Sequence, residues 1–77
     1  MINATLYPGI KKIEFINGSI LFVHLTNERV FIVPVGKFPA IKNLSPEEKN
    51  MFEIIDNKYL SFLAIDDVYS LEELIGL

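Results

Sequence analysis

With 77 residues, of which 51% are hydrophobic and none is cysteine, the chain is long enough for one small domain with a modest core. The hydrophobic fraction excludes a disordered chain, and the lack of cysteine excludes a disulfide framework and a thiolate metal site. Seven Lys and Arg residues against ten Asp and Glu give a net charge of −3, and the basic residues are scattered, unlike those of a nucleic-acid-binding surface.

The amino-terminal stretch "MINATLYPGIKK" has no apolar run behind a basic region, and the sequence contains no continuous apolar segment of about 18 residues. We therefore expect neither secretion nor membrane insertion, and we expect a cytoplasmic protein. The sequence shows no internal repeat, low-complexity tract or linker. Residues 1–77 are expected to form a single domain.

Three strands are predicted between Ile10 and Val35, a region rich in Ile, Val and Phe. The turns between them are "NGS" at 17–19 and "TNER" at 26–29. Asn17-Gly18 is the stronger turn signal, because both residues tolerate the positive φ of a type I′ turn. If both turns contain two residues, the register follows from them and assigns each side chain to one face of the sheet.

Both predicted faces are apolar. The aromatic one is expected to form the internal core, whereas the aliphatic one is expected to be covered by the second half of the chain or by another molecule. The aromatic face comprises Ile13, Phe15, Ile20, Phe22, His24, Phe31 and Val33, and the aliphatic face comprises Lys12, Glu14, Ile16, Leu21, Val23, Leu25, Val30 and Ile32.

After Pro34, Gly36 and Pro39 interrupt any strand, and "LSPEEKNMF" then predicts a helix of about two turns that begins at Pro46. Ser45 is its expected N-cap, and Glu48 completes a capping box. Two further strands are predicted at about 53–56 and 59–63, with a turn at Asn57-Lys58.

The acidic stretch "IDDVYSLEEL" (65–74) has two interpretations, a cation site or the start of a helix. It lacks the alternating spacing and the glycine of a calcium loop, so we predict no metal site. Ser70 and Glu73 form a second capping box, and Tyr69 with Leu74 fits a hydrophobic staple, which together predict a short C-terminal helix. Asp66 and Asp67 are expected to accept backbone hydrogen bonds in the preceding turn.

The complete prediction is an α+β fold: a three-stranded antiparallel meander, a short helix, a second β-hairpin and a short C-terminal helix.

His24 is the only histidine, so any histidine-dependent mechanism must use it. Its place in an apolar strand favours a structural role, in which one ring nitrogen is hydrogen-bonded. The serines have turn or cap explanations, and the four glycines stand singly, so that no phosphate-binding loop is formed. We predict no catalytic residue and no cofactor. The enzyme alternative requires His24 in an open cleft beside Asp66 or Asp67.

Two further features are candidates for partner contacts. Phe38-Pro39 is either held against the core or offered to a partner. A loose basic rim is the weaker candidate, because such charges are more often simply solvated; it comprises Lys11, Lys12, Arg29, Lys37 and Lys42.

The order of these signals resembles the bacterial domain of unknown function 2442 family. The resemblance runs from about Gly18 to the end of the chain, through "LTNERVFIVP" (25–34), "KFPAI" (37–41), "LSPEEKNMFEII" (44–55) and "FLAIDDVYSLEELI" (62–75). The chain departs from the family pattern where Glu28 replaces a turn glycine, Phe62 a tryptophan and Ser61 a common histidine. No functional role of that histidine or tryptophan is therefore carried over.

The resemblance implies a small α+β domain without a defined activity. Members of the family are often encoded beside another small protein in toxin–antitoxin pairs, and some are fused to a helix-turn-helix domain. The sequence to Leu77 contains no such domain, so an association with DNA is expected to need a partner protein. That DNA-associated regulator is one alternative, and a hydrolase-like enzyme that uses His24 is another.

The favoured hypothesis is a non-enzymatic protein-binding or regulatory module, antitoxin-like, that binds a protein partner or a second copy of itself through an apolar sheet face. Direct binding to nucleic acid or to a membrane is not expected. The predicted partner-binding residues are Leu21, Val23, Val30, Ile32, Phe38, Asp66 and Asp67.

Overall fold

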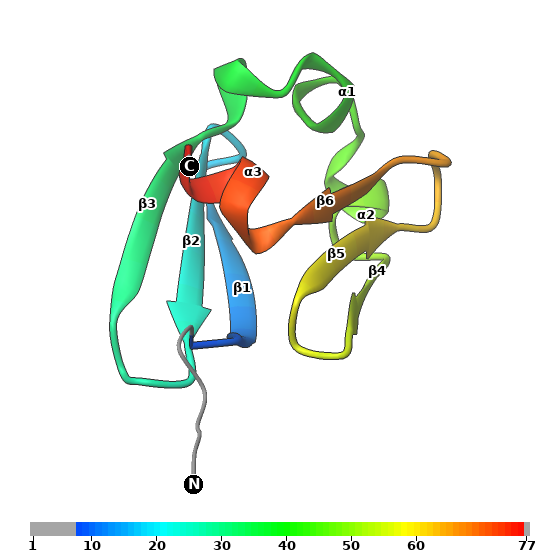
Figure 1. Cartoon of the computed structure of the whole chain (residues 1–77). Coiled ribbons are helices and arrows are strands. Elements are labelled where there is room, and N and C mark those ends of the chain that lie inside the picture. Colours follow the sequence, from blue (N-terminus) through cyan, green and yellow to red (C-terminus); the bar gives the residue numbers. More distant parts are fainter. Residues whose placement is uncertain (1–7, 77) are drawn as a thin grey trace, which may run out of the picture.

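The computed structural model describes residues 8–76, which form two three-stranded antiparallel sheets and short helices (Figure 1). In chain order the elements are β1 (Ile10–Ile16), β2 (Ile20–Leu25), β3 (Val30–Pro34), the 3₁₀ helix η1 (Val35–Lys37), α1 (Pro39–Lys42), α2 (Pro46–Lys49), β4 (Phe52–Ile55), β5 (Tyr59–Phe62), β6 (Val68–Ser70) and α3 (Leu71–Ile75). The predicted α+β fold is confirmed. The expectation about the amino-terminal stretch falls mostly on residues 1–7, outside the described range.

The core lies between the two sheets. The sheets β1-β2-β3 and β4-β5-β6 stand side by side, the segment from η1 to α2 joins them at one end, and α3 returns to the first sheet beside β3 (Figure 1). Each of these parts contributes aliphatic or aromatic side chains that are almost completely removed from water. The buried residues are Ile10, Ile13, Leu21, Val23, Leu25, Val33, Val35, Ile41, Leu44, Leu60, Phe62, Leu71 and Leu74.

The first turn has the predicted backbone conformation but one more residue than predicted. Asn17 and Gly18 have φ values of 54° and 71°, as in a type I′ turn, and the Ser19 N–H donates to the Ile16 carbonyl over 3.2 Å. Ile16 pairs with Ile20, however, so that Ser19 is an extra residue within the connection. Since side chains alternate along a strand, this single residue places every side chain of β2 on the face opposite to the one predicted from a two-residue turn.

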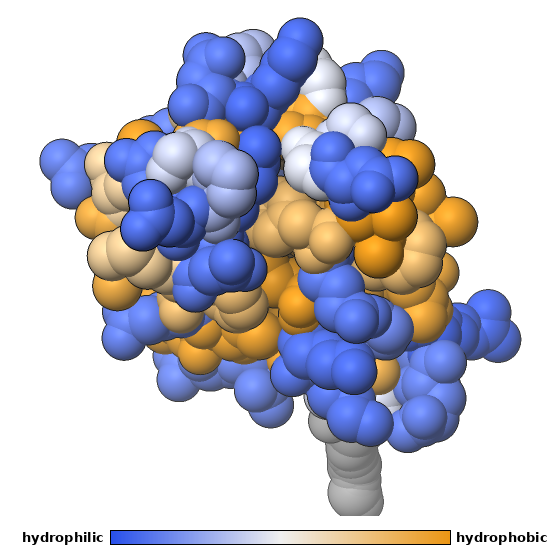
Figure 2. Space-filling model, turned by 180° about the vertical axis from the view of Figure 1, so that it is seen from behind, coloured by the Kyte–Doolittle hydropathy of each residue, from blue (hydrophilic) through white to orange (hydrophobic). Residues whose placement is uncertain are grey.

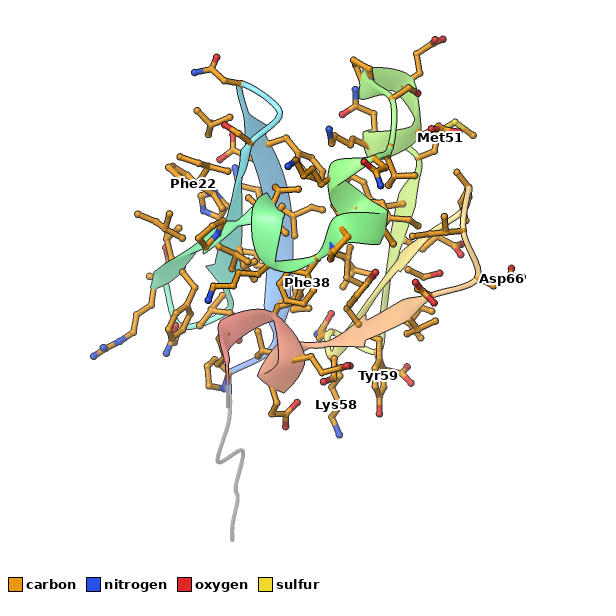
Figure 3. The ribbon with its side chains drawn as sticks, turned by 90° about the horizontal axis from the view of Figure 1, so that it is seen from above. Phe22, Phe38, Met51, Lys58, Tyr59 and Asp66 are labelled. Carbon is orange, nitrogen blue, oxygen red and sulfur yellow. The ribbon has the colours of Figure 1, made fainter. Side chains whose placement is uncertain are left out.

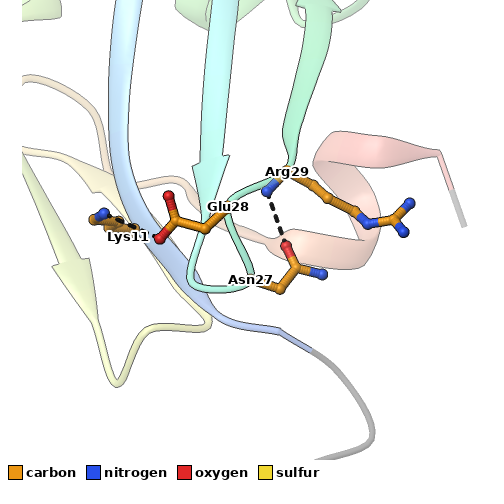
Figure 4. Close-up of polar contacts among 4 residues, drawn as sticks. All are labelled: Lys11, Asn27, Glu28 and Arg29. Carbon is orange, nitrogen blue, oxygen red and sulfur yellow. Dashed lines mark hydrogen bonds and ion pairs between the residues drawn. The ribbon is translucent and has the colours of Figure 1, made fainter.

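The second turn shifts the register again. The Leu25 N–H donates to the Arg29 carbonyl over 2.8 Å, which leaves three residues, 26–28, in the turn. Glu28 takes a φ of 74°, and the Asn27 side chain accepts a hydrogen bond from the Arg29 N–H over 3.1 Å (Figure 4). Lys11 and Glu28 form an exposed ion pair at 3.6 Å beside this turn (Figure 4).

The extra residue in the second turn reverses the effect of the extra residue in the first. The side chains of β3 therefore lie on the predicted faces, and only those of the middle strand, β2, lie on the opposite faces. Leu21, Val23 and Leu25 point into the core, where the sequence predicted the other three side chains of β2. Ile20, Phe22 and His24 lie on the opposite face. The predicted aromatic core face was therefore wrong for β2 and correct for Ile13, Phe15 and Val33.

Both predicted capping boxes are present. At α2 the Ser45 Oγ accepts from the Glu48 N–H, and the Glu48 carboxylate accepts from the Ser45 N–H. Ser70 and Glu73 make the same reciprocal pair at α3, which ends at Gly76 with a left-handed φ of 85°. The helix α2 spans one turn instead of the expected two, since β4 already begins at Phe52.

The second hairpin is confirmed, with its turn one residue earlier than predicted. Asp56 and Asn57 have φ values of 53° and 59°, and the Lys58 N–H donates to the Ile55 carbonyl over 2.9 Å. Lys58 is thus an extra residue, as Ser19 is in the first hairpin. Three short elements were not predicted: η1, α1, in which Pro39 takes the first helical position, and β6, which pairs with β5.

Candidate functional site

We use the name outer face for the side of the first sheet that points away from the second sheet. By the observed register it presents Lys12, Glu14, Ile16, Ile20, Phe22, His24, Val30, Ile32 and Pro34. Figure 3 shows Phe22 pointing away from the second sheet. Figure 2 shows hydrophobic side chains at the surface on the side of the molecule where the first sheet lies, and others on the opposite side.

Three aliphatic side chains of the outer face are substantially exposed: Ile16 at 38%, Val30 at 45% and Ile32 at 64%. Phe22 lies between the strands that carry them, opposite Ile32 in the register, and is partly buried. The neighbouring β1 positions are occupied by Lys12 and Glu14. The outer face therefore has an apolar stripe along β2 and β3, formed by Ile20, Phe22, Val30, Ile32 and Pro34, and Lys12, Glu14 and His24 form a polar border beside it.

His24 lies on this outer face and not on the predicted core face. Its Nε2 is hydrogen-bonded to a carboxylate oxygen of Glu14 on the neighbouring strand. The enzyme alternative required His24 beside Asp66 or Asp67, and Figure 3 shows Asp66 on the side of the molecule opposite the first sheet. The structure thus does not bring these residues together.

Asp66 and Asp67 are exposed in the turn that precedes β6. Among residues 8–76, neither carboxylate accepts a backbone hydrogen bond, so the expectation of such bonds was wrong. The turn is instead closed by the main chain, where the Ile65 N–H donates to the Phe62 carbonyl over 3.2 Å. Asp67 accepts a 3.3 Å hydrogen bond from the Tyr69 hydroxyl.

Tyr69 connects this turn to the core. Burial raises the pKa of its hydroxyl, and the negative charge and hydrogen bond of Asp67 raise this pKa further, with a smaller contribution from the charge of Glu73. Its ring packs edge-on against Phe38 with a centroid distance of 5.4 Å. Figure 3 shows Phe38 between the two sheets, so this residue is held against the core.

The predicted partner-binding residues do not form one surface. Leu21 and Val23 are 0% exposed and belong to the core, which is a correction of the predicted face. Val30 and Ile32 lie on the outer face as predicted. Phe22 was not predicted as their neighbour on this face, and the only signal for it in the sequence was the number of residues in the turn at 17–19.

Several hollows open on the described part of the surface, among them the following three. One of about 250 Å³ runs between β3 and α3 and is lined in part by Phe31, Val33, Phe38 and Ile75. A second, of about 700 Å³, lies at the end of the molecule where Thr26, Asn57 and Lys58 meet. The third, of about 280 Å³, includes the buried side chain of Lys49. His24 lines none of the three.

The described residues contain no group of three or more His, Cys, Asp or Glu side chains placed to hold a metal ion. None of the helices within 8–76 has the length and apolar character needed to cross a membrane. Comparison of the chain with family models, with curated proteins and with solved structures gave no match.

Proposed function

We propose that the chain is a non-enzymatic protein-binding module that acts through the outer face of its first sheet. The observation that carries this proposal is the exposure of Val30 and Ile32 beside Phe22 on one strand pair. In a small monomer, clustered exposed aliphatic and aromatic side chains are typical of an interaction site. The free energy of binding would come from removing this apolar surface from water.

The shape and border of the outer face favour a protein partner over a small ligand. Small-molecule sites are concave, whereas Phe22 and Val30 line none of the hollows described above, and only the hollow of about 250 Å³ reaches the stripe, at Ile32 and Pro34 on its edge. Protein interfaces combine an apolar centre with a polar rim. Lys12, Glu14 and His24 supply such a rim next to the stripe.

The resemblance to the domain of unknown function 2442 family extends this proposal to an antitoxin-like, regulatory and cytoplasmic protein. The α+β fold agrees with what the resemblance implies. Direct contact with nucleic acid is not part of the proposal, because the lysines and arginines are scattered along the chain. A DNA-associated role would instead depend on the bound protein.

Affinity capture with three baits tests the proposal. Ile32→Glu places a charge in the proposed interface, where its desolvation opposes binding. Leu63→Glu is the matched control, since Leu63 is exposed to a similar degree, 57%, but lies outside the first sheet. We expect a protein retained by the wild type and by Leu63→Glu but lost with Ile32→Glu. Equal recovery with all three folded baits would contradict the proposal.

A further inference from the structure

The strand β3 forms a free edge of the first sheet, and its outward hydrogen-bonding groups can be identified. Among the described strands, β3 pairs with β2 alone. The Arg29 carbonyl and the Val35 N–H both bond to the β2 side, to Leu25 and Ser19. The direction of the backbone N–H and C=O groups alternates from one residue to the next along an antiparallel strand. The backbone groups of Phe31 and Val33 therefore also point toward β2, whereas those of Val30, Ile32 and Pro34 point away from it. No acceptor for the Val30 or Ile32 N–H lies within residues 8–76.

Of the features by which proteins protect exposed strands, this edge has only a proline, Pro34, at its end. Charged side chains and very short length are the usual protections. The edge strand β1 carries Lys11, Lys12 and Glu14, β4 carries Glu53, and β6 has only three residues. The sequence of β3, "VFIVP", is five residues long and contains no charge.

We propose that β3 pairs antiparallel with β3 of a second copy, centred on Ile32, so that the two first sheets become one continuous six-stranded sheet. This inference rests on the proposed function and specifies its partner. In this register the Ile32 N–H of each copy donates to the Ile32 carbonyl of the other. Each Val30 N–H donates to the partner subunit's Pro34 carbonyl. Both outward donors are satisfied, and Pro34, which has no N–H, leaves none unpaired.

The side chains agree with the same pairing. On the outer face the two Ile32 side chains become neighbours, and Val30 lies beside the partner subunit's Pro34, so no charge is buried. On the inner side Phe31 is 40% exposed and comes to lie opposite the partner subunit's Val33. Val33 borders the hollow of about 250 Å³ between β3 and α3, into which the Phe31 ring of the second copy would insert.

The size of the contact sets the expected affinity. A five-residue edge with three exposed apolar side chains buries a few hundred Å² per copy, below the roughly 800 Å² per partner of a standard stable interface. Dimerisation is therefore expected in the micromolar range, reversible on dilution, and not as an obligate assembly.

Sedimentation velocity over a concentration series, with three variants, tests the pairing. Ile32→Pro removes the outward N–H but no bond to β2, and proline is tolerated at an edge. Ile32→Arg keeps the N–H and places two like charges together at the two-fold axis. Leu63→Arg is the control with matched exposure. We expect the wild type and Leu63→Arg to dimerise, and both Ile32 variants to dimerise at least about tenfold more weakly, with unchanged far-UV circular dichroism.

Amide hydrogen exchange identifies the edge directly. At high concentration the Val30 and Ile32 amides should exchange more slowly than at low concentration, while those of Phe31 and Val33 are protected at both. A protein that stays monomeric to several hundred micromolar, or a dimer without this added protection, overturns the inference. If Ile32→Glu still abolishes capture of another protein in that case, the proposed function stands and only the self-pairing fails.

Discussion

Replacement of Leu21 by alanine is expected to destabilise the fold severely, because Leu21 is 0% exposed and lies at the centre of β2. Truncation of a buried leucine costs about 2–5 kcal/mol through lost burial and the cavity left behind. A 77-residue domain has a total free energy of unfolding of about 4–12 kcal/mol. The variant should therefore lose a large part of its stability, and its melting temperature should fall by about 8 °C or more.

Urea denaturation followed by far-UV circular dichroism measures this loss, at a protein concentration low enough to exclude self-association. Ile32→Ala is the exposed control and should change the free energy of unfolding by less than about 0.5 kcal/mol. Phe22→Ala distinguishes the two registers, since two-residue turns would bury Phe22 and expose Leu21. A larger loss for Phe22→Ala than for Leu21→Ala would refute the observed orientation of β2.

The remaining predictions concern the α3 cap, a tyrosine and a turn. Ser70→Ala should lower the free energy of unfolding, measured in urea, by about 1 kcal/mol because it removes the N-cap of α3. Ser70→Asp should lose much less, since aspartate is also a good N-cap residue. An equal loss in both variants would contradict the capping role. The pKa of Tyr69 is raised in the folded state, so the unfolded chain releases the hydroxyl proton at a lower pH than the folded chain does. The free energy of unfolding should therefore keep its full value below about pH 10 and decrease as the pH rises above it. Thermal melts of Tyr69→Phe should show a shallower fall, and an identical pH profile would count against the assignment. Glu28→Gly should increase the free energy of unfolding by about 0.5–1 kcal/mol and so raise the melting temperature, because glycine adopts the positive φ at this position without a Cβ clash. A lower melting temperature would exclude this explanation.

The parts of the fold that depend on short segments of sequence were predictable. The capping boxes at Ser45 and Ser70 involve residues only three positions apart, and their signals did not depend on the rest of the chain. The strands and the positive φ at Asn17 and Gly18 were likewise encoded locally. These elements have the predicted type, although α2 is one turn shorter than predicted.

Register and the shortest elements were not predictable in the same way. The turn "NGS" specified its backbone conformation but not whether Ser19 belongs to the strand, and that one residue decides which face of β2 is buried. The main chain adds a reason that lies far away in sequence, since the Ser19 carbonyl accepts from the Val35 N–H over 3.0 Å. β6 has three residues and exists through its pairing with β5.

The same one-residue difference changed the candidate site. Val30 and Ile32 remained exposed because β3 kept its predicted orientation, whereas Leu21 and Val23 exchanged places with Ile20 and Phe22. An apolar outer face was therefore predictable, but its β2 residues, Ile20, Phe22 and His24, were not. The roles of Asp66 and Asp67 could not be derived from spacing, since the preceding turn is closed by backbone groups.

We propose that the outer face and edge of the first sheet form the recognition surface of this protein. A concentration series of ¹H–¹⁵N correlation spectra examines this surface residue by residue, because each amide reports on its own surroundings. We expect progressive shift changes that centre on Phe22, Val30 and Ile32 as the concentration rises. Changes that centre instead on the exposed apolar residues of the second half, Met51, Leu63 and Val68, would contradict it.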